Sequence, residues 1–447
     1  MSQSISEQLA DAVATANPAP MQEVVERLLI DVGGLCVAAR NTDYVRAALA
    51  GWEASGGCTA IGHQRALDAA GAAFVNGTAA HGEDFDDTFE GGPVHAGAVI
   101  VPAVLALAER ERITGQDALR AIAVGVELMC RASLVAPKLI HKAGFHPTAV
   151  LGAMGAAAAA ATLLRLDKKG FVDALGIAGS MAGGIIEYLA EGAWTKRLHP
   201  GWAAQSGIRA ADLARQGFVG PRSVFEGTHG LYHGFARSAQ GDWAKLVEGF
   251  GERWVSQALA FKVYACGTMT HPYIDCARRL SSRVEIQQIE KIVCEAAEGT
   301  VHRLWEPLAA KQRPPNAYAA KFSQPYCIAA GLVLGHAGLE AFTEERVRDP
   351  RLLALAAKVR YEIDPHNPYP DEFTGHVRVV LRSGASVEER QAHFRGGAHE
   401  PLSRADLEEK FRRNCAHGGW PRERGEAFLA WAKSALSGPV DLAFLRR

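Results

Sequence analysis

The segment 81–95, with the sequence HGEDFDDTFEGGPVH, places several acidic residues between two histidines in a stretch too rich in glycine for a plain helix face. Crowded carboxylates raise one another's pKa, so such a group on an ordered loop indicates charged partners or acid–base chemistry. A solvated acidic turn is the alternative. Asp84, Asp86 and Asp87 could also offer oxygens to Mg²⁺ or Ca²⁺, but the segment lacks the residue order of a known calcium loop.

Two further segments carry side chains suited to a site for an anion. His146 stands in GFHPT before an alanine-rich stretch, where Thr148 could cap a helix whose N-terminus favours an anion or a neutral imidazole. Lys196 follows in GAWTKRLHPGW, together with Arg197 and His199, and a lysine among glycines could bind a carboxylate. A structural histidine and a solvated lysine are the alternatives.

The chain from residue 260 onward adds three more polar candidates. Lys262 and His271 lie in FKVYACGTMTHPYID near an expected domain boundary, where ligand clefts are common. Tyr326 in AKFSQPY could donate a proton or a hydrogen bond, although any buried tyrosine needs such a partner. The fingerprints of nucleotide binding, zinc proteases and serine hydrolases are absent, so those functions lose their usual support.

The elements that position these residues change character along the chain. Helical spacing of apolar residues dominates residues 1–264, and TAVLGAMGAAAAAATLLRL predicts a central buried helix that its neighbours approach closely. Short β-branched runs at 289–295, 358–363 and 377–381, with a turn at RSGAS, predict strands and a hairpin. Ser403 is the expected N-cap of a C-terminal helix, with Leu402 and Leu407 as a hydrophobic staple.

These patterns predict a mainly α fold: an all-helical domain over 1–264, completed by 402–447, and a smaller α+β domain with an antiparallel sheet over 265–401. A length of 447 residues agrees with more than one core.

The bulk composition limits the classes of partner. The 48 Lys and Arg balance 49 Asp and Glu, which gives no basic surface for nucleic acid or an anionic membrane. Eight cysteines without a C-x-x-C pair favour reduced, buried thiols, and the polar start lacks the features of a signal peptide. A cytoplasmic location with no membrane partner is therefore expected. The apolar run 149–164 is too short and too rich in alanine to span a bilayer.

Taken in order, five segments resemble the MmgE/PrpD family over nearly the whole chain. They are NGTAAHGEDFDDTFEGGPVHAGAVIVPAVLALAER, GFHPTAVLGAMGAAAAAATLLRL, EGAWTKRLHPGWAAQSGIRAADLARQGFVGP, AKFSQPY and PLSRADLEEKFR. The family includes 2-methylcitrate dehydratase, cis-aconitate decarboxylase and iminodisuccinate epimerase. The resemblance implies a large helical domain, a smaller α+β domain with a cleft between them, a homodimer, and neither a metal nor an organic cofactor.

Carried over residue by residue, the resemblance implies a pocket with five catalytic and three substrate-binding residues. The catalytic set is Asp84, His95, His146, Lys196 and Lys262, and the substrate-binding set is Thr88, His271 and Tyr326. Glu83 departs from the family pattern because an apolar residue is common before DFDDT, and Ala96 and Val263-Tyr264-Ala265 depart as well. A charged glutamate there would discourage a substrate carboxylate, so these departures bear on the substrate more than on the fold.

The primary hypothesis is a lyase that acts on a small di- or tricarboxylate by dehydrating a 2-methylcitrate-like hydroxy acid. Lys196 and Lys262 would bind carboxylates, His146 or Asp84 would remove the α-proton, and His95 would protonate the departing hydroxyl. Asp86 and Asp87 are expected to support the loop. Decarboxylation of a cis-aconitate-like acid and epimerisation of an iminodisuccinate-like acid are the alternatives within enzymes. A carboxylate-binding protein without turnover is the alternative outside them.

Overall fold

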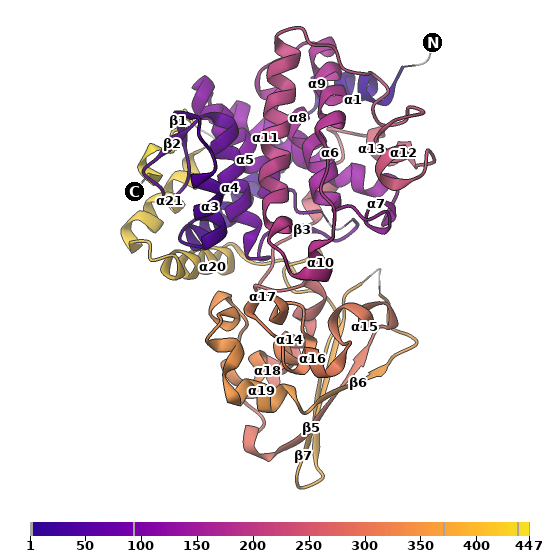
Figure 1. The fold of residues 1–447 in the computed structure, drawn as a ribbon, viewed down its shortest axis with the longest axis vertical. Coiled ribbons are helices and arrows are strands. Elements are labelled where there is room, and N and C mark those ends of the chain that lie inside the picture. Colours follow the sequence, from indigo (N-terminus) through magenta and orange to yellow (C-terminus); the bar gives the residue numbers. More distant parts are fainter. Residues whose placement is uncertain (1–2, 93, 370–371, 436–437, 447) are drawn as a thin grey trace. The chain divides into compact units, whose positions relative to one another are not determined.

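The computed structural model describes residues 3–92, 94–369, 372–435 and 438–446, so Pro93 of the acidic segment and the outermost residues of the expected domains lie outside the described residues. The chain forms two compact units. The first comprises residues 1–82, 86–260 and 403–447, and the second comprises residues 83–85 and 261–402. Helices dominate the first unit and a helix-backed sheet marks the second, which confirms the predicted mainly α fold class (Figure 1).

The first unit is built almost wholly from helices. They are α1 (Ile5–Thr15), α2 (Gln22–Ala39), α3 (Asp43–Ala50), α4 (Ala69–Gly82), α5 (Gly97–Glu111), α6 (Gly115–Val135), α7 (Leu139–Lys142), α8 (Pro147–Leu163), α9 (Lys168–Met181), α10 (Tyr188–Glu191), α11 (Thr195–Arg215), α12 (Leu231–Ala236), α13 (Trp243–Val247), α20 (Arg404–His417) and α21 (Arg422–Ser434). Two short antiparallel pairs accompany them, β1 (Ser55–Thr59) with β2 (Ala66–Leu67) and β3 (Thr88–Phe89) with β4 (Leu259–Ala260). The expectation of a purely helical domain was therefore slightly too simple.

Helix α8 is the buried centre of this unit, as the alanine-rich sequence predicted. It packs against α5, α6, α9 and α11. The small side chains allow these helices to approach closely: a Cβ on Gly155 would lie 2.9 Å from the backbone oxygen of Gly125 in α6. The predicted cap at Thr148 was wrong, because His146 occupies the N-cap position and the hydroxyl of Thr148 accepts a hydrogen bond from the backbone N–H of His95 at 3.3 Å.

The C-terminal helices α20 and α21 return to the first unit (Figure 1). Both helices pack against α2. Ser403 caps α20 by accepting a hydrogen bond from the backbone N–H of Asp406, and Asp406 completes a capping box. The predicted N-cap is therefore confirmed, and both Leu402 and Leu407 are buried as a staple requires.

The second unit packs helices against a four-stranded sheet of order β6-β5-β7-β8. Its strands are β5 (Ile289–Ala296), β6 (Val359–Ile363), β7 (Gly375–Leu381) and β8 (Ser386–Gln391), and its helices are α14 (His271–Ser281), α15 (Glu298–Leu304), α16 (Leu308–Gln312), α17 (Ala317–Ala320), α18 (Gln324–Leu334) and α19 (Pro350–Ala356). The predicted β7–β8 hairpin is confirmed, and β5 also pairs antiparallel with β7. The β5–β6 pair is parallel, because the helical segment between these strands is long enough to return the chain in the same direction.

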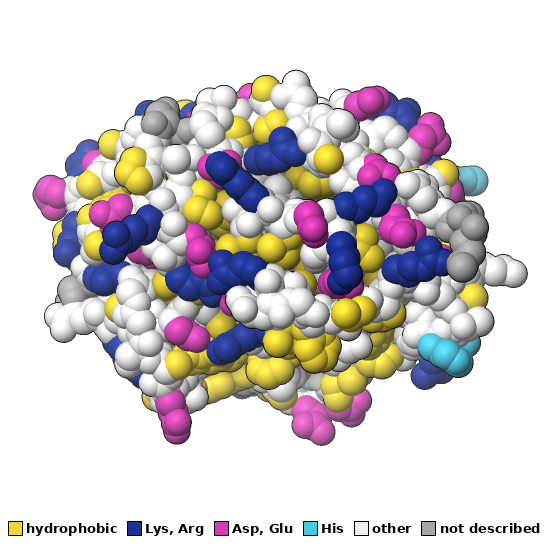
Figure 2. Space-filling model, turned by 90° about the horizontal axis from the view of Figure 1, so that it is seen from above, with side chains coloured by type: hydrophobic (Ala, Val, Ile, Leu, Met, Phe, Trp, Pro, Cys, Tyr) yellow, Lys and Arg dark blue, Asp and Glu magenta, His cyan; other side chains and the backbone are white. Residues whose placement is uncertain are grey.

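The mixed charges of the surface and the buried thiols agree with what the composition predicted. Figure 2 shows Lys and Arg side chains interspersed with Asp and Glu on the face seen from above, with hydrophobic side chains between them, so that face carries no field of a single sign. All eight cysteines are buried and free. Among the described residues, no helix combines the length and the apolar character that a membrane crossing requires.

Candidate functional site

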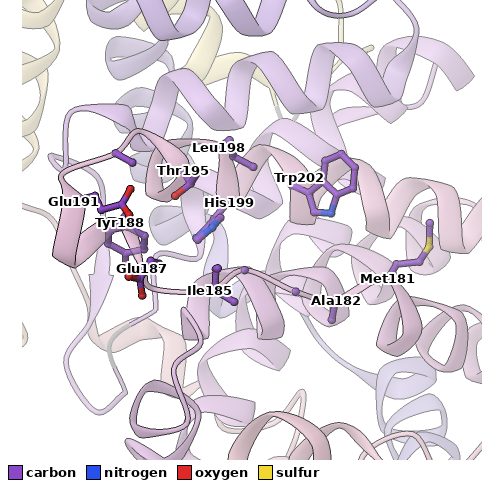
Figure 3. Close-up of a pocket in the computed structure, with 13 residues that line it drawn as sticks. Met181, Ala182, Ile185, Glu187, Tyr188, Glu191, Thr195, Leu198, His199 and Trp202 are labelled. Atoms are coloured by element: carbon purple, nitrogen blue, oxygen red, sulfur yellow. The ribbon is translucent and has the colours of Figure 1, made fainter.

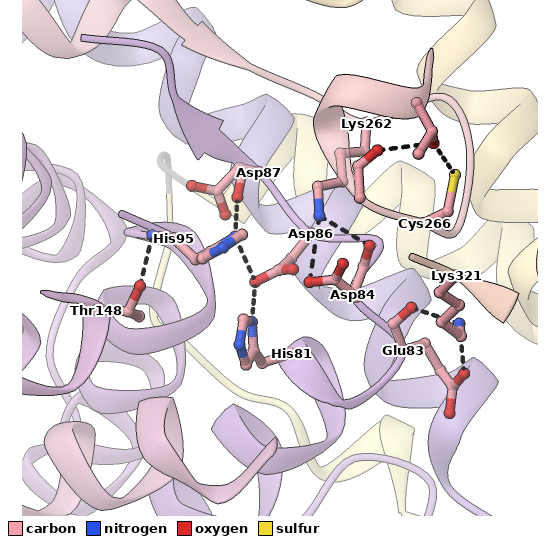
Figure 4. A network of polar contacts seen from close by, with 12 residues as sticks. His81, Glu83, Asp84, Asp86, Asp87, His95, Thr148, Lys262, Cys266 and Lys321 are labelled. Atoms are coloured by element: carbon pink, nitrogen blue, oxygen red, sulfur yellow. Dashed lines mark hydrogen bonds and ion pairs between the residues drawn. The ribbon is translucent and has the colours of Figure 1, made fainter. Parts of the chain in front are cut away.

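In the first unit, three histidines from different elements lie close together, and Asp86 contacts two of them, His81 and His95. His81 comes from the last turn of α4, His95 precedes α5, and His146 begins α8. Nδ1 of His81 lies 2.7 Å from Oδ2 of Asp86, and Nδ1 of His95 lies 3.5 Å from the same oxygen (Figure 4). The ring centroid of His81 lies 4.7 Å from that of His95 and 5.7 Å from that of His146. The structure thus brings the predicted residues His95 and His146 into one buried imidazole cluster.

The backbone oxygen and the carboxylate of Asp87 both hold the loop that carries His95. The backbone oxygen of Asp87 lies 2.7 Å from Nδ1 of His95, and its carboxylate accepts a hydrogen bond from the N–H of Gly97 at the start of α5. Burial, together with the neighbouring charge of Asp86, raises the pKa of Asp87 to about 8. Asp86 holds the imidazoles and Asp87 holds the loop, so the supporting role expected for both residues agrees with their contacts.

His146 has a second imidazole as its direct partner. Its Nδ1 lies 3.0 Å from Nδ1 of His199, which comes from the second turn of α11. Burial, then the nearby His81 and Lys196, hold the pKa of His146 well below its usual range. The same three causes lower the pKa of His199 to about 4. Both rings are therefore neutral near pH 7.

Lys196 and Thr88 complete the predicted set in the first unit. Lys196 lies in the first turn of α11, is only 9% exposed, and is close enough to lower the pKa of both His146 and His199. Thr88 is buried in β3, opposite Ala260. A buried cation beside neutral imidazoles can stabilise negative charge that develops on a bound acid, because water does not screen it.

His199 also lines a pocket of about 480 Å³. Its walls come from the segment between α9 and α10 and from the first turns of α11, and they include Ile185, Tyr188 and Trp202 (Figure 3). Glu187 and Glu191 contribute carboxylates to the lining. His199 belongs to this lining, and its contact with His146 connects the pocket to the buried imidazole cluster.

The ring nitrogens of His81, His95 and His146 could in principle hold a metal ion, since one nitrogen from each lies within 4.8 Å of the others. Neutral imidazole nitrogens are common ligands of zinc, and nitrogens that share one tetrahedral zinc ion lie about 3.4 Å apart.

In the second unit, Asp84 and Lys262 form a buried ion pair. Nζ of Lys262 lies 3.4 Å from Oδ1 of Asp84 and donates a hydrogen bond to its backbone oxygen at 2.9 Å (Figure 4). The side chain of Lys262 is 1% exposed and that of Asp84 is 4% exposed. Asp84 also has a φ of 55°, a left-handed conformation that costs energy for a residue with a Cβ. Such strain, held by a buried cation, is typical of a functional site.

The neighbouring residue Glu83 has its own buried partner. Nζ of Lys321 lies 3.0 Å from its carboxylate and donates to its backbone oxygen at 2.7 Å. Lys321 also lies over the ring of Phe342, at 5.3 Å from the centroid. The expected unbalanced charge of Glu83 is therefore compensated within the same unit.

The remaining two predicted residues, His271 and Tyr326, lie in the core of the second unit. Nε2 of His271 lies 3.4 Å from the backbone oxygen of Cys266, and its ring packs between Tyr264 and Phe394. The hydroxyl of Tyr326 donates to the backbone oxygen of Ala341 at 2.7 Å, and burial raises the pKa of this phenol. The hydroxyl of Tyr326 thus has the partner that any buried tyrosine needs, whereas Nδ1 of His271 is buried without a hydrogen-bond partner among the described residues.

Sequence reasoning did not assign three residues that the structure connects to the predicted ones: His81, His199 and Lys321. His81 begins the acidic segment, His199 stands three residues after Lys196, and Lys321 is the second residue of the AKFSQPY segment. Each was visible as part of a quoted motif. Their roles depended on partners far away in the chain, which no local pattern identifies.

Comparisons with known proteins agree with this architecture. The model of the MmgE/PrpD N-terminal domain matches residues 3–244, and that of the MmgE/PrpD C-terminal domain matches residues 264–431. The chain is 33% identical over 368 residues to the cis-aconitate decarboxylase of Homo sapiens, covering 77% of this chain and 72% of that protein. It is 32% identical over 355 residues to the Mus musculus enzyme of the same name, covering 77% and 71%. It is 27% identical over 423 residues to a cis-aconitate decarboxylase-like protein of Aspergillus oryzae, covering 89% and 86%. The chain is thus a lyase-type enzyme and belongs to the MmgE/PrpD family.

Proposed function

We propose that this protein decarboxylates a small unsaturated tricarboxylate of the cis-aconitate type. The observation that carries the proposal is the buried pair of neutral imidazoles, His146 and His199, beside Lys196, which offers a proton donor and a cation in one water-poor place. The names of the relatives in mouse, human and Aspergillus support the same substrate class.

Decarboxylation of such an acid needs both a fixed cation and a proton donor. When CO2 leaves, the C–C bond to the departing carboxylate breaks, and its electron pair moves through the neighbouring C=C bond onto a carbon beside another carboxylate. A fixed cation stabilises that enolate-like charge most strongly where water is excluded. In our proposal Lys196 is that cation, and His146 gives the carbon its proton.

The comparisons favour this reaction over the dehydration of a 2-methylcitrate-like acid that was our primary hypothesis. The neutral imidazoles of His146 and His199 also suit decarboxylation better than dehydration. Dehydration requires a base that removes a proton and an acid that protonates a hydroxyl group, whereas decarboxylation requires only a proton donor. A neutral His146 with hydrogen on one ring nitrogen can fill that single role.

The test is to incubate the purified protein with ¹³C-labelled cis-aconitate in D2O and to follow the acid by NMR. We expect labelled CO2 and a five-carbon unsaturated dicarboxylate that carries one deuterium on carbon. A parallel sample contains 2-methylcitrate, and another contains iminodisuccinate. A Lys196→Met variant is the control for catalysis by contaminants.

Each other outcome would overturn the proposal in a defined way. Loss of water from 2-methylcitrate without loss of CO2 from cis-aconitate would restore the dehydratase hypothesis. Deuterium exchange in iminodisuccinate without net change would identify an epimerase. Binding of these acids without any turnover would favour a carboxylate-binding protein.

A further inference from the structure

We propose that His199 passes protons from the pocket of the first unit to His146 and fixes which ring nitrogen of His146 carries hydrogen. This inference rests on the proposed decarboxylation, and it assigns a role to a residue that neither the sequence motifs nor the comparisons single out. His199 acts through His146, so it is a positioning residue and not one that touches the substrate.

The first argument is the contact between the two rings. Their Nδ1 atoms are 3.0 Å apart. Such a contact is attractive only when one of the two nitrogens bears hydrogen and the other offers a lone pair. If Nδ1 of His199 donates, His146 must keep its own hydrogen on Nε2. The ring of His146 then presents a proton donor to the imidazole cluster, as the decarboxylation requires.

The second argument is that the backbone holds both rings in this arrangement. The N–H of His146 donates to the backbone oxygen of Gly184 at 2.8 Å, and His146 is the fixed N-cap of α8. Tyr188 packs against both imidazoles, with ring centroids 6.2 Å from His146 and 5.8 Å from His199. Neither ring can turn away without disturbing these contacts, so the Nδ1 contact is a built feature of the fold.

The third argument is access to the pocket. His199 lines the pocket and His146 does not, although both residues are 5% exposed. Gly184 keeps the outer edge of the His199 ring open: a Cβ there would lie 3.3 Å from Nε2 of His199 and 2.5 Å from Cβ of Ala149. Gly184 also has a φ of 121°, which disfavours any residue with a side chain. Water in the pocket can therefore reach Nε2 of His199.

A neutral His146 needs such a relay, because loss of its Nε2 hydrogen alone would leave an anionic imidazolate. The C–C bond breaks, CO2 leaves, and the carbanion takes the Nε2 hydrogen of His146. Nδ1 of His146 simultaneously takes the Nδ1 hydrogen of His199, and Nε2 of His199 takes a proton from water in the pocket, which leaves a hydroxide there. Both rings begin and end neutral. After the product leaves, water in the emptied site gives a proton to Nε2 of His146, and the relay runs backwards and returns a proton to the hydroxide in the pocket. The starting tautomers are restored, and the hydroxide that remains in the emptied site combines with the released CO2 as bicarbonate, so the net proton of each turnover comes from water.

The experiment compares three variants under the decarboxylation assay. His199→Ala removes the relay and leaves space in the pocket. His199→Asn offers an amide near the position of Nδ1, so it can hold the tautomer of His146 but cannot carry a proton. His233→Asn is the matched control, because His233 is an exposed histidine of the same unit, in α12.

We expect His199→Ala to lower kcat at least about tenfold with little change in KM, and we expect added imidazole to restore part of the loss. His199→Asn should lower kcat without rescue, because its side chain fills the space. A full kcat in His199→Ala would overturn the relay. So would a lowered kcat in a folded His199→Ala protein that imidazole does not restore.

A second measurement keeps this inference separate from the proposed reaction. The ¹⁵N shifts of the His146 ring report its tautomer in the resting protein, without any substrate. We expect hydrogen on Nε2 in the wild type and a mixture of tautomers in His199→Ala. An unchanged tautomer would refute the positioning role even if the enzyme is a decarboxylase. The expected shift would support that role even if cis-aconitate is not the substrate.

Discussion

The carboxylate of Glu83 lies 3.0 Å from Nζ of Lys321, and both groups belong to the second unit. Lys262 holds the next residue, Asp84, in the same way. Two adjacent acidic residues thus bind two buried lysines. These contacts explain why residues 83–85 group with the second unit although the residues on either side belong to the first.

The two ion pairs should differ in their contribution to stability. We expect Lys262→Met to lower the free energy of unfolding by about 3–5 kcal/mol, because it leaves the 4% exposed carboxylate of Asp84 buried without its cation. Lys321→Met should cost only about 1–2 kcal/mol, since Glu83 is 18% exposed and keeps some hydration. Urea unfolding of both variants measures the difference. Equal losses would show that burial does not determine the cost.

A double variant tests the origin of that cost. Adding Asp84→Asn to Lys262→Met removes the unpaired charge, so we expect the double variant to recover much of the lost stability. The coupling energy follows from the unfolding free energies of both single variants and the double variant. A strictly additive cycle would mean that the two side chains do not interact energetically.

Asp87 should make the protein less stable as the pH rises. Its pKa of about 8 lies above the ordinary value of 3.8, so between these values the folded state keeps a proton that the unfolded state loses. The free energy of unfolding therefore falls by up to about 1.4 kcal/mol per pH unit across that window. Asp87→Asn should remove this slope and stabilise the protein at pH 7. Urea titrations at pH 5, 6 and 7 compare the two, and identical slopes would contradict the prediction.

The pair His146 and His199 should make the protein less stable as the pH falls below 6.5, which is opposite to the effect of Asp87. Both pKa values are lowered by burial and by nearby His81 and Lys196. Below pH 6.5 the unfolded state binds protons that the folded state refuses, so this contribution to stability is lost as the pH falls toward about 4. His199→Asn should flatten the acid limb of a stability–pH curve. Ring signals of both histidines should also stay unchanged between pH 6 and pH 8 in NMR spectra, and a titration there would refute neutral rings.

Lys196 should matter for turnover more than for folding. We expect Lys196→Met to lower kcat by about two orders of magnitude or more, because the charge on the reacting acid loses its cation. Lys142→Met is the control, since Lys142 is an exposed residue of α7. Circular dichroism checks that both variants are folded. A kcat near that of the wild type in Lys196→Met would remove this residue from the proposed mechanism.

Local patterns predicted the elements well because they depend on neighbours in the chain. The alanine-rich stretch became α8, the RSGAS turn joined β7 to β8, and Ser403 capped α20. The Thr148 cap failed for a tertiary reason: its hydroxyl serves the backbone of His95 from another element. The parallel β5–β6 pair was missed because pairing direction depends on the path of the connection, which periodicity does not reveal.

The sequence by itself determined the elements, the family resemblance and most of the polar residues that the structure gathers. Only the tertiary structure decided their partners. His146 meets His199 across 53 residues, and Lys321 meets Glu83 across 238. Those contacts arise where packed helices bring distant segments together, and burial then removes the water that would screen them. For this reason the protonation of His146 and the balanced charge of Glu83 are properties of the fold, although every residue involved is visible in the chain.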